Sequence, residues 1–292
     1  MKLCRFDQAR VGLVQDGEVL DISDGVAPLL ASPPGPGDPL IAALPRFSGR
    51  IPELARGAGK APLGRVSLLS PVQRPTKIVA VGRNYRAHRE EMQQRPDSKA
   101  KAKPVLPKGV PPLFIKSTSS LVGASAGIAR RFPERLTEHE IELVVVVGRE
   151  ARGVPATRAL DHVAGYSIGV DVTLRGPEDT SLRKSIDSYT VVGPWLVTAD
   201  EIPDPDNLWL KSACNGVLRQ NASTADMIVG VADAIAYAST FFPLYPGDLL
   251  FTGTPSGVGP IQPGDILDFE CERIGAMRVA VRGYGDPATE RR

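Results

Sequence analysis

The sequence predicts an α+β fold that is mostly β, with a small N-terminal β-rich domain followed by a larger domain. Two observations carry this prediction. Short apolar runs of strand length recur along the chain, and turns separate them, in keeping with its 29 glycines and 27 prolines. One clear helix is expected from about residue 224 to residue 240, where apolar residues recur at helical spacing and Asp226 lies in the first turn.

The small domain is predicted to span residues 1–70. A proline-rich stretch at 33–39 interrupts regular structure, and residues 40–44 are a candidate short helix. The strands expected in this domain are 3–6, 11–14 and 18–21, the last two joined by a hairpin turn at Gln15-Asp16-Gly17.

The larger domain is predicted to span residues 71–292, entered through Pro71 and Pro75. Its first strand, 77–82, is apolar throughout its centre and is followed by residues 83–92, which have helical character. Further strands are expected at 113–116, 141–147, 165–172, 195–197, 208–214, 248–252, 266–271 and 277–282.

Charge and cysteine content exclude several classes of protein. A formal net charge of +2 is too small to indicate a nucleic-acid or membrane-surface partner. No apolar run approaches the roughly 20 residues that cross a bilayer, and the first residues lack the apolar core of a signal peptide. Cys4, Cys214 and Cys271 are odd in number and far apart, so neither disulfides nor thiolate zinc is expected. A cytoplasmic protein is the resulting prediction.

Three acidic residues beside apolar runs form a candidate metal site. Glu140 and Glu142 open the run 141–147, and positions i and i+2 of a strand share a face, roughly 7 Å apart. Two neighbouring carboxylates are costly without positive charge between them. Asp171 ends the next apolar run, and three oxygen ligands on neighbouring strand ends suit a hard divalent cation. The alternative is a solvated strand start with surface ion pairs.

Histidine is scarce, so each of the three can be weighed. His88 and Glu91 are three residues apart, and a helix would place them in contact. A carboxylate beside an imidazole fixes its tautomer, as a general base acting on water requires; the alternative is an exposed helix pair. His139 is predicted to point away from the two candidate glutamate ligands, and His162 to have a structural role at a helix end.

Three other segments each allow a functional and a structural interpretation, and a fourth matches a motif but lacks the context that the motif requires. Lys184 can neutralise a bound carboxylate or an enolate, or can be a surface lysine. The turn at 252–259 can offer N–H groups and the Thr254 hydroxyl to an anion, or can be only a turn. The basic stretch 98–112 is expected to be a solvated loop, with a lid as the alternative. Residues 123–127 match G-x-S-x-G, but no clear helix follows and no histidine lies beyond His162, which disfavours a serine hydrolase.

Taken together, these segments resemble the fumarylacetoacetate hydrolase family over nearly the whole chain. Each landmark is weak singly, but eight in the right order are specific. They are Val81-Gly-Arg-Asn-Tyr-Arg-Ala-His88, Leu113-Phe-Ile-Lys116, Glu140-Ile-Glu142-Leu, Gly165-Tyr-Ser-Ile-Gly-Val-Asp171-Val-Thr, Lys184-Ser-Ile-Asp187, Gly193-Pro-Trp195, Asn215-Gly216 and Thr252-Gly-Thr-Pro-Ser-Gly-Val-Gly259.

The resemblance implies a mixed β-roll catalytic domain in a homodimer with a small-molecule 2-oxo acid as substrate. It implies Mg²⁺ or Mn²⁺, with Ca²⁺ as an alternative occupant in crystals, held by Glu140, Glu142 and Asp171. His88 and Glu91 match the family's water-activating dyad, carried on a segment that orders over the substrate. The implied substrate contacts are Lys184, at the oxo-carboxylate end, with Arg83, Tyr85, Arg175 and Thr254.

One departure from the family pattern bears on the substrate. Where the family often has Arg-Asp-x-Gln after the third metal ligand, this chain reads Arg175-Gly-Pro-Glu178. Arg175 is kept, but Gly176 replaces the aspartate and Glu178 replaces the glutamine. The role of that glutamine at the substrate is therefore not transferred, and a substrate of different shape or charge is expected.

The implied activity is divalent-metal-dependent hydrolysis of a C–C bond in an acylpyruvate-type 2,4-dioxo acid of fumarylacetoacetate or fumarylpyruvate type. The products are a carboxylic acid and pyruvate or a related compound, in the breakdown of aromatic compounds. The same metal–enolate chemistry suits oxaloacetate decarboxylation, or hydration or isomerisation of a 2-oxo-hept-3-ene-dioate. A non-catalytic binding protein is disfavoured, because it would not need the His88–Glu91 dyad.

Overall fold

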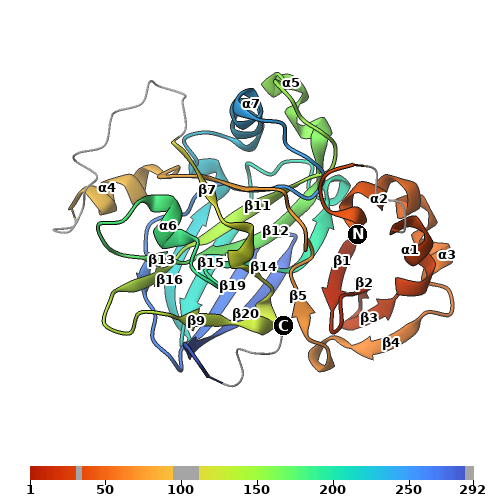
Figure 1. Ribbon diagram of the computed structural model, residues 1–292, viewed down its shortest axis with the longest axis horizontal. Coiled ribbons are helices and arrows are strands. Elements are labelled where there is room, and N and C mark those ends of the chain that lie inside the picture. Colours follow the sequence, from red (N-terminus) through yellow and green to blue (C-terminus); the bar gives the residue numbers. More distant parts are fainter. Residues whose placement is uncertain (31–34, 95–111, 287–292) are drawn as a thin grey trace.

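A large mixed sheet runs through the molecule (Figure 1). The computed structural model describes residues 1–30, 35–94 and 112–286, and within them this sheet has 12 strands. Its order is β4 (Gly59–Pro62), β3 (Glu18–Asp21), β2 (Arg10–Gln15), β1 (Lys2–Phe6), β14 (Thr190–Thr198), β12 (Val163–Asp171), β11 (Ile141–Val147), β17 (Leu249–Phe251), β6 (Ile78–Val81) and β7 (Leu113–Lys116), with β5 (Leu68–Leu69) on β1 and β8 (Leu121–Val122) on β14.

Two smaller sheets complete the β structure of the described residues. The five-stranded sheet has the order β16 (Val217–Ser223), β15 (Trp209–Cys214), β19 (Ile266–Cys271), β20 (Gly275–Gly283) and β9 (Ile128–Arg130). The three-stranded sheet has the order β13 (Thr173–Leu174), β10 (Thr137–His139) and β18 (Gly259–Pro260). Parallel pairs such as β6–β17 and β9–β20 occur among antiparallel ones, so the predicted mixed, mostly β fold is confirmed.

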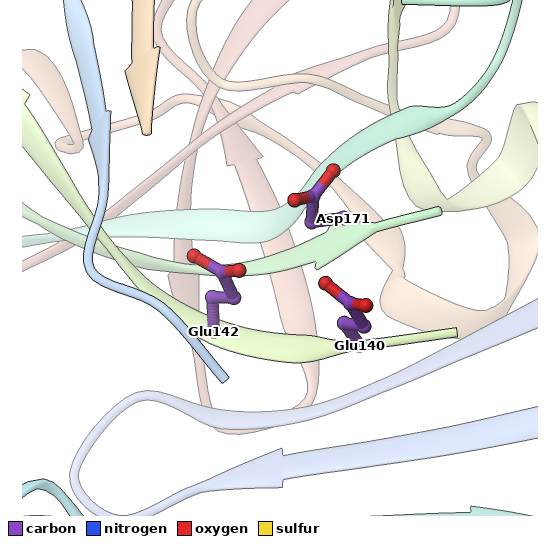
Figure 2. Close-up of side chains that lie close together, drawn as sticks. All are labelled: Glu140, Glu142 and Asp171. Carbon is purple, nitrogen blue, oxygen red and sulfur yellow. The ribbon is translucent and has the colours of Figure 1, made fainter. Parts of the chain in front are cut away.

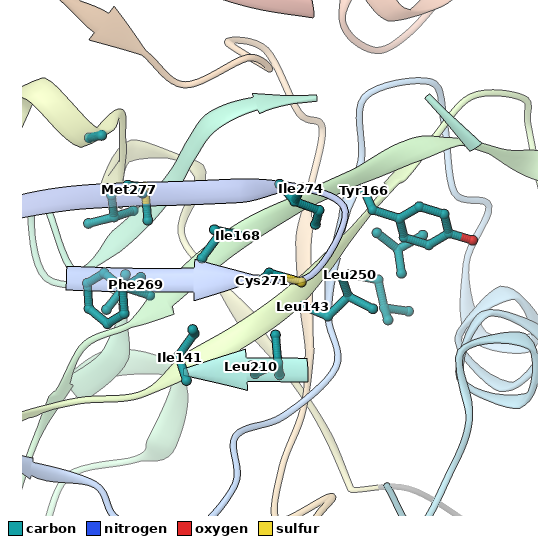
Figure 3. Close-up of a cluster of buried hydrophobic side chains, with 14 of the residues drawn as sticks. Ile141, Leu143, Tyr166, Ile168, Leu210, Leu250, Phe269, Cys271, Ile274 and Met277 are labelled. Atoms are coloured by element: carbon teal, nitrogen blue, oxygen red, sulfur yellow. The ribbon is translucent and has the colours of Figure 1, made fainter. Parts of the chain in front are cut away.

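The two faces of β11 contribute to two different cores. Ile141, Leu143 and Val145 point into the core between the large and the five-stranded sheets, which Figure 3 shows around Phe269. Val144 and the next even-numbered residue, Val146, point into the core shared with the N-terminal segment. This alternation is the period of a strand that is buried on both sides. Glu140 and Glu142 therefore continue the face of Val144, as the i, i+2 spacing predicted.

The N-terminal segment is joined to the rest of the molecule by strand pairing and by packing. Lys2 and Leu3 of β1 pair with β14. The helices here are α1 (Ser23–Leu30), α2 (Pro39–Phe47) and α3 (Ile51–Leu54), at the right of Figure 1. Asp38 caps α2 by accepting hydrogen bonds from Leu40 N and Ile41 N. The division at residue 70 remains a prediction.

The predicted helix at 224–240 begins later than expected. Thr224–Asp226 is a single 3-10 turn, and α7 spans Val231–Phe241. Between them, Asn84 holds the backbone in a non-helical conformation. Its side chain accepts a hydrogen bond from Val229 N at 2.9 Å, and its carbonyl accepts one from Ile228 N at 2.7 Å. The first N–H of α7, at Val231, donates to Asp206 rather than to a local cap. Asp226 is therefore not in the first turn of the helix.

The remaining α-helices lie beyond residue 70. They are α4 (Arg86–Gln94), α5 (Ala156–Ala159) and α6 (Thr180–Lys184). Helices α1, α3 and α6 were missed from the sequence, where Gly25 and Pro28 lower the helix propensity of α1. No helix in the described part of the chain is long and apolar enough to cross a bilayer.

Candidate metal centre and active site

Three buried carboxylates converge where β11 begins and β12 ends (Figure 2). Ile141 pairs with Val170, and Asp171 N donates to the Glu140 carbonyl at 2.9 Å, which brings the strand ends into register. Ligand oxygens of Glu140, Glu142 and Asp171 all lie within 4.8 Å of one another. Their side chains are almost fully buried, so the alternative of a solvated strand start is excluded. The structure thus brings the three predicted ligands together.

Two buried lysines supply part of the positive charge that these carboxylates require. Lys184 Nζ donates to Glu140 at 2.7 Å and to Asp171 at 2.5 Å, so it is not a surface residue. Lys116 Nζ contacts Asp171 from another direction and donates to the Tyr189 carbonyl at 2.9 Å. Sequence reasoning treated Lys116 only as part of a family landmark. The apolar run Leu113-Phe-Ile-Lys116 ends on a lone lysine, and this pattern could have predicted the contact, because a fully buried lysine needs an acidic partner.

The charge compensation is uneven across the three carboxylates. Glu142 accepts a hydrogen bond from Gly253 N at 2.7 Å and has no basic partner within hydrogen-bond distance among the described residues. Burial raises the pKa of Glu142 well above its usual range, and the Asp171 carboxylate raises it further. Burial also opposes ionisation of Glu140, but Lys184 and Arg175 outweigh it and hold the pKa of Glu140 below its usual range. An all-oxygen donor set with one uncompensated carboxylate fits a hard divalent cation.

The predicted dyad is formed, and its His88 lines the cavity that the three carboxylates also line. His88 Nδ1 lies 3.1 Å from Glu91 Oε2 on α4, as the i, i+3 spacing predicted. The His88 side chain is buried, so it is not half of an exposed pair. Gly257 N donates to both carboxylate oxygens of Glu91, at 3.2 and 3.3 Å. Glu91 is thereby oriented from outside its own helix.

The departures at Gly176 and Glu178 belong to one structural unit. Arg135 donates to both carboxylate oxygens of Glu178, at 2.8 and 2.7 Å, and to the Arg175 carbonyl at 2.9 Å. A Cβ atom at position 176 would lie 1.8 Å from the Arg135 guanidinium. Glycine is therefore required here for the guanidinium to reach both partners. Glu178 is held by Arg135 and is not free to act as the family's glutamine does.

Arg175 lies against the metal centre. Its guanidinium contacts the Glu138 carboxylate and donates to Glu140 Oε1 at 3.2 Å. Arg175 thus links Glu138 of β10 to the candidate ligand Glu140, which precedes β11. The geometry therefore favours a role in holding Glu140 over the predicted contact with substrate.

A cavity of about 720 Å³ joins these groups. Of the predicted substrate contacts, Arg83, Arg175, Lys184 and Thr254 line it. Tyr85 does not: its side chain is 1% exposed, and its hydroxyl has no hydrogen-bond partner in the described structure. The Thr254 hydroxyl donates to the Ile141 carbonyl at 2.8 Å and accepts from Gln220 at 2.7 Å. Its donor and one of its two acceptor lone pairs are thus used within the protein.

The remaining candidates have structural roles or lie outside the description. His139 packs edge-on against Phe269, away from the carboxylates. His162 ends the 3-10 turn Leu160–His162 and does not line the cavity. Ser125 accepts from Leu68 N at 2.7 Å, and strand β9 rather than a helix follows it, which excludes the nucleophile elbow. The predicted loop or lid at 98–112 falls, except for its last residue, outside the described residues.

Comparison with known proteins agrees with this geometry. Residues 77–282 match the model of the C-terminal domain of fumarylacetoacetate hydrolase. A maleylpyruvate hydrolase of Aquipseudomonas alcaligenes is 45% identical over 293 residues, covering 97% of this chain and 99% of that protein. The mitochondrial oxaloacetate tautomerase Fahd2a of Rattus norvegicus is 35% identical, covering 74% of this chain and 69% of that protein.

A solved structure shares the fold over nearly the whole chain. The maleylpyruvate hydrolase of Sphingobium sp. SYK-6, in complex with manganese(II) and pyruvate, superposes with a TM-score of 0.82 at 33% identity, covering 97% of this chain and all of that one. These relatives confirm the predicted enzyme class, a metal-dependent hydrolase acting on C–C bonds, and agree with Mn²⁺ as a cofactor. With the eight landmarks in order and the acidic cluster in place, the chain belongs to the fumarylacetoacetate hydrolase family.

Proposed function

We propose that the protein hydrolyses an acylpyruvate-type 2,4-dioxo acid whose far end carries a second carboxylate, releasing pyruvate and a carboxylic acid. The observation that carries this proposal is the convergence of three groups on one cavity: the acidic cluster, the His88–Glu91 dyad and Lys184. The relatives named maleylpyruvate hydrolase support it.

Glu140, Glu142 and Asp171 would hold the divalent cation. A cation bound there would polarise the 2-oxo group of the substrate and stabilise negative charge on the enolate that forms. Lys116 and Lys184 pair with the Asp171 carboxylate and orient it, and Arg175 does the same for Glu140. The uncompensated Glu142 carboxylate gives the site its capacity for one more positive charge.

The His88–Glu91 dyad would activate water. In this mechanism His88 Nδ1–H would donate a hydrogen bond to Glu91, which leaves Nε2 free to take a proton from a water molecule. The resulting hydroxide would attack the carbonyl carbon distal to the oxo-acid end, forming a C–O bond. Collapse would break the adjacent C–C bond, with its electron pair passing to the pyruvate fragment as an enolate. The proton held by His88 would return to the carbon of that enolate, which balances the reaction.

Lys184 would act at the carboxylate end of the substrate. Two of its three N–H donors are used by Glu140 and Asp171, and the third is available to the cavity. An ammonium group fixed this way is positioned before the reaction and needs no reorganisation as charge develops. The lysine thus binds substrate and stabilises the leaving fragment from a single position.

Two arginines on the cavity would receive the far-end carboxylate. Arg83 and Arg183 both line the cavity, and neither has an acidic partner within hydrogen-bond distance among the described residues. Arg83 adopts a φ of 53°, in the left-handed region that non-glycine residues enter uncommonly. Arg183 donates one hydrogen bond to the Leu174 carbonyl at 3.2 Å. A planar guanidinium with free donors suits a carboxylate.

Turnover of a substrate panel tests the reaction. We expect maleylpyruvate and fumarylpyruvate to be cleaved with Mn²⁺ or Mg²⁺, acetylpyruvate to be cleaved with a higher KM, and chelation to abolish turnover. Product analysis by NMR distinguishes hydrolysis, which gives two acids, from decarboxylation, which gives CO₂, and from hydration or isomerisation, which give a single product. A faster keto–enol exchange of oxaloacetate without cleavage would instead assign the activity that names the tautomerase relative.

Two variants test the assigned residues. Glu140→Ala should lower metal-dependent turnover by about 10³-fold or more, with exposed Glu150→Gln as the control. Full metal-dependent turnover by Glu140→Ala would show that the metal assignment is wrong.

Arg183→Leu should raise KM for maleylpyruvate about tenfold and leave KM for acetylpyruvate nearly unchanged, because only the first carries a far-end carboxylate.

Two further properties belong to the proposal. We infer a homodimer, supported by the family resemblance and by exposed apolar side chains such as Trp209 and Leu218, which are 55% and 59% exposed. We also infer a cytoplasmic location, in keeping with three free, buried cysteines. Light scattering on the purified protein measures the first, and cell fractionation the second.

A further inference from the structure

Gln220 is a fully buried polar residue on a strand that is otherwise open to solvent or half-buried. Strand β16 has no other buried side chain, and Gln220 is 0% exposed. A bulge explains how it turns inward: Ser212 pairs with Gln220 and Ala213 with Leu218, so Arg219 is left over between them. Bulges re-aim side chains, and they recur next to active sites.

The side-chain amide of Gln220 uses its full hydrogen-bonding capacity. Its Oε1 atom accepts from Ile141 N and from the Ser212 hydroxyl, both at 3.1 Å. Its Nε2 atom donates to the Thr254 hydroxyl at 2.7 Å and to the Pro255 carbonyl at 2.9 Å. Two donors and two acceptors are all that a glutamine side chain offers, so the amide has one favourable orientation.

The residue that Gln220 holds, Ile141, lies between two of the proposed metal ligands. In a strand, the N–H and C=O of one residue point to the same edge. At this edge β17 pairs only with Val144–Val146, so it does not reach Ile141. Gln220 receives the Ile141 N–H, and the Thr254 hydroxyl donates to the Ile141 carbonyl. Two side chains therefore take the place of a neighbouring strand where Glu140 and Glu142 must be held at a fixed spacing.

The same amide also fixes the loop that contacts the reacting groups. Gln220 holds this loop, residues 253–257, at Pro255. On one side of Pro255, Gly253 N donates to Glu142, and on the other side Gly257 N donates to Glu91 of the dyad. Gly257 fits only because it has no side chain: a Cβ would lie 2.1 Å from the Arg219 carbonyl. The loop thus packs directly on the backbone beside Gln220.

We propose that Gln220 is a positioning residue that sets the spacing of Glu140 and Glu142 and ties the dyad-holding loop to them. It touches neither the cavity nor a ligand carboxylate, so it acts through Ile141 and through the loop. This inference rests on the proposed metal site. It predicts that one uncharged, buried amide on the five-stranded sheet controls both metal affinity and the rate of the chemical step.

The test compares two variants that each remove buried hydrogen bonds at the same amide. Gln220→Met keeps the volume and removes all four bonds, whereas Ser212→Ala removes only the bond that leads away from the metal centre. Mn²⁺ affinity is measured by electron paramagnetic resonance without substrate, and unfolding is followed by heat with and without Mn²⁺. We expect Gln220→Met to weaken Mn²⁺ binding about 10–100-fold and to lower kcat. Ser212→Ala should change Mn²⁺ affinity by less than about threefold.

The outcomes separate this inference from the proposed function. If the unaltered protein fails to bind Mn²⁺, the proposed metal site itself is wrong. If it binds Mn²⁺ and Gln220→Met binds equally well with unchanged kcat, Gln220 is merely structural. Should Gln220→Met not fold, Gln220→Glu replaces it: the acceptor to Ile141 N is kept, but an oxygen then faces the Pro255 carbonyl. Wild-type Mn²⁺ affinity and kcat in Gln220→Glu would overturn the proposal equally.

Discussion

The two walls of the cavity are built by different physical means. The first wall is the segment 252–257, which lines the cavity through Thr254. It is held by uncharged, buried groups: Gln220 bonds Thr254 and Pro255, and Asn84 Nδ2 donates to the Thr252 carbonyl at 2.7 Å. The second wall, residues 175–179, is fastened by the Arg135–Glu178 ion pair, whose side chains are 25% and 32% exposed. A loop held by several buried hydrogen bonds cannot shift without leaving polar groups unpaired, whereas a partly exposed ion pair can exchange with water.

This difference in bonding indicates that the two walls have different functions. The first wall points two backbone N–H groups at groups that do chemistry, Glu142 and Glu91. The second wall reaches the metal centre only through Arg175, and its other residues present their surfaces to the cavity. Changes at the first wall should therefore act on kcat, metal affinity and folding. Changes at the second wall should act mainly on KM.

The largest effect should come from the dyad that the first wall orients. His88→Asn removes the proposed general base and should lower kcat about 10²–10⁴-fold. Mn²⁺ affinity should stay within about threefold, because His88 is not among the proposed ligands. Glu90→Gln, an exposed change on the same helix, is the control. A kcat within tenfold of the unaltered protein would remove His88 from the mechanism.

The next largest effect should come from Gly257→Ala. Gly257 has a φ of 96°, and its Cβ position lies 2.1 Å from a backbone oxygen, which cannot swing away as a side chain can. Strain and overpacking together should lower the free energy of unfolding by about 2–5 kcal/mol. Urea unfolding measures this loss, and kcat should fall with it because the N–H that holds Glu91 is displaced. Unchanged stability would show that the first wall yields as easily as the second.

The parts of the site that are formed by residues close together in the sequence could be predicted. Glu140 and Glu142 are two residues apart, so the period of a strand predicts that they share a face. His88 and Glu91 are three residues apart, so the period of a helix predicts their contact. Asp171 followed because consecutive apolar strands tend to be neighbours. Most strands of the large sheet were predicted from their apolar runs, but β4, β5 and β8 were not, and only residues 195–197 of β14 were.

Contacts between distant segments could not be read from any local pattern. Lys116 meets Asp171 across 55 residues, Arg135 meets Glu178 across 43, and Gln220 meets Ile141 across 79. Distant contacts also overrode propensity: Asn84 reshapes residues 227–229 and delays the start of α7. The family pattern identified Gly176 and Glu178 as departures, but only the fold shows that Arg135 links them.

A smaller effect is expected from Gly176→Ala, the matched partner of Gly257→Ala. The new Cβ would meet the end of the flexible Arg135 side chain, which can move aside. The midpoint of thermal unfolding should therefore fall by less than about 3 °C. Displacing Arg135 would expose the Glu178 carboxylate to the cavity, so KM for maleylpyruvate should rise about 3–10-fold with kcat nearly unchanged. A loss of stability as large as that of Gly257→Ala would abolish the contrast between the walls.

The smallest and most specific effect should come from Glu178→Gln, which restores the residue common in the family. Removing this carboxylate frees Arg135 to add positive charge beside the cavity, so KM for a doubly charged substrate should fall about 2–5-fold. The gain should shrink at high salt, because both side chains are partly exposed to solvent. In the double variant Gly176→Ala, Glu178→Gln, the rise in KM caused by the alanine should disappear, since no carboxylate remains to be released. Steady-state kinetics with maleylpyruvate and acetylpyruvate at two salt concentrations measure all three changes. A fall in kcat at constant KM would instead place Glu178, and with it the second wall, in the chemical step.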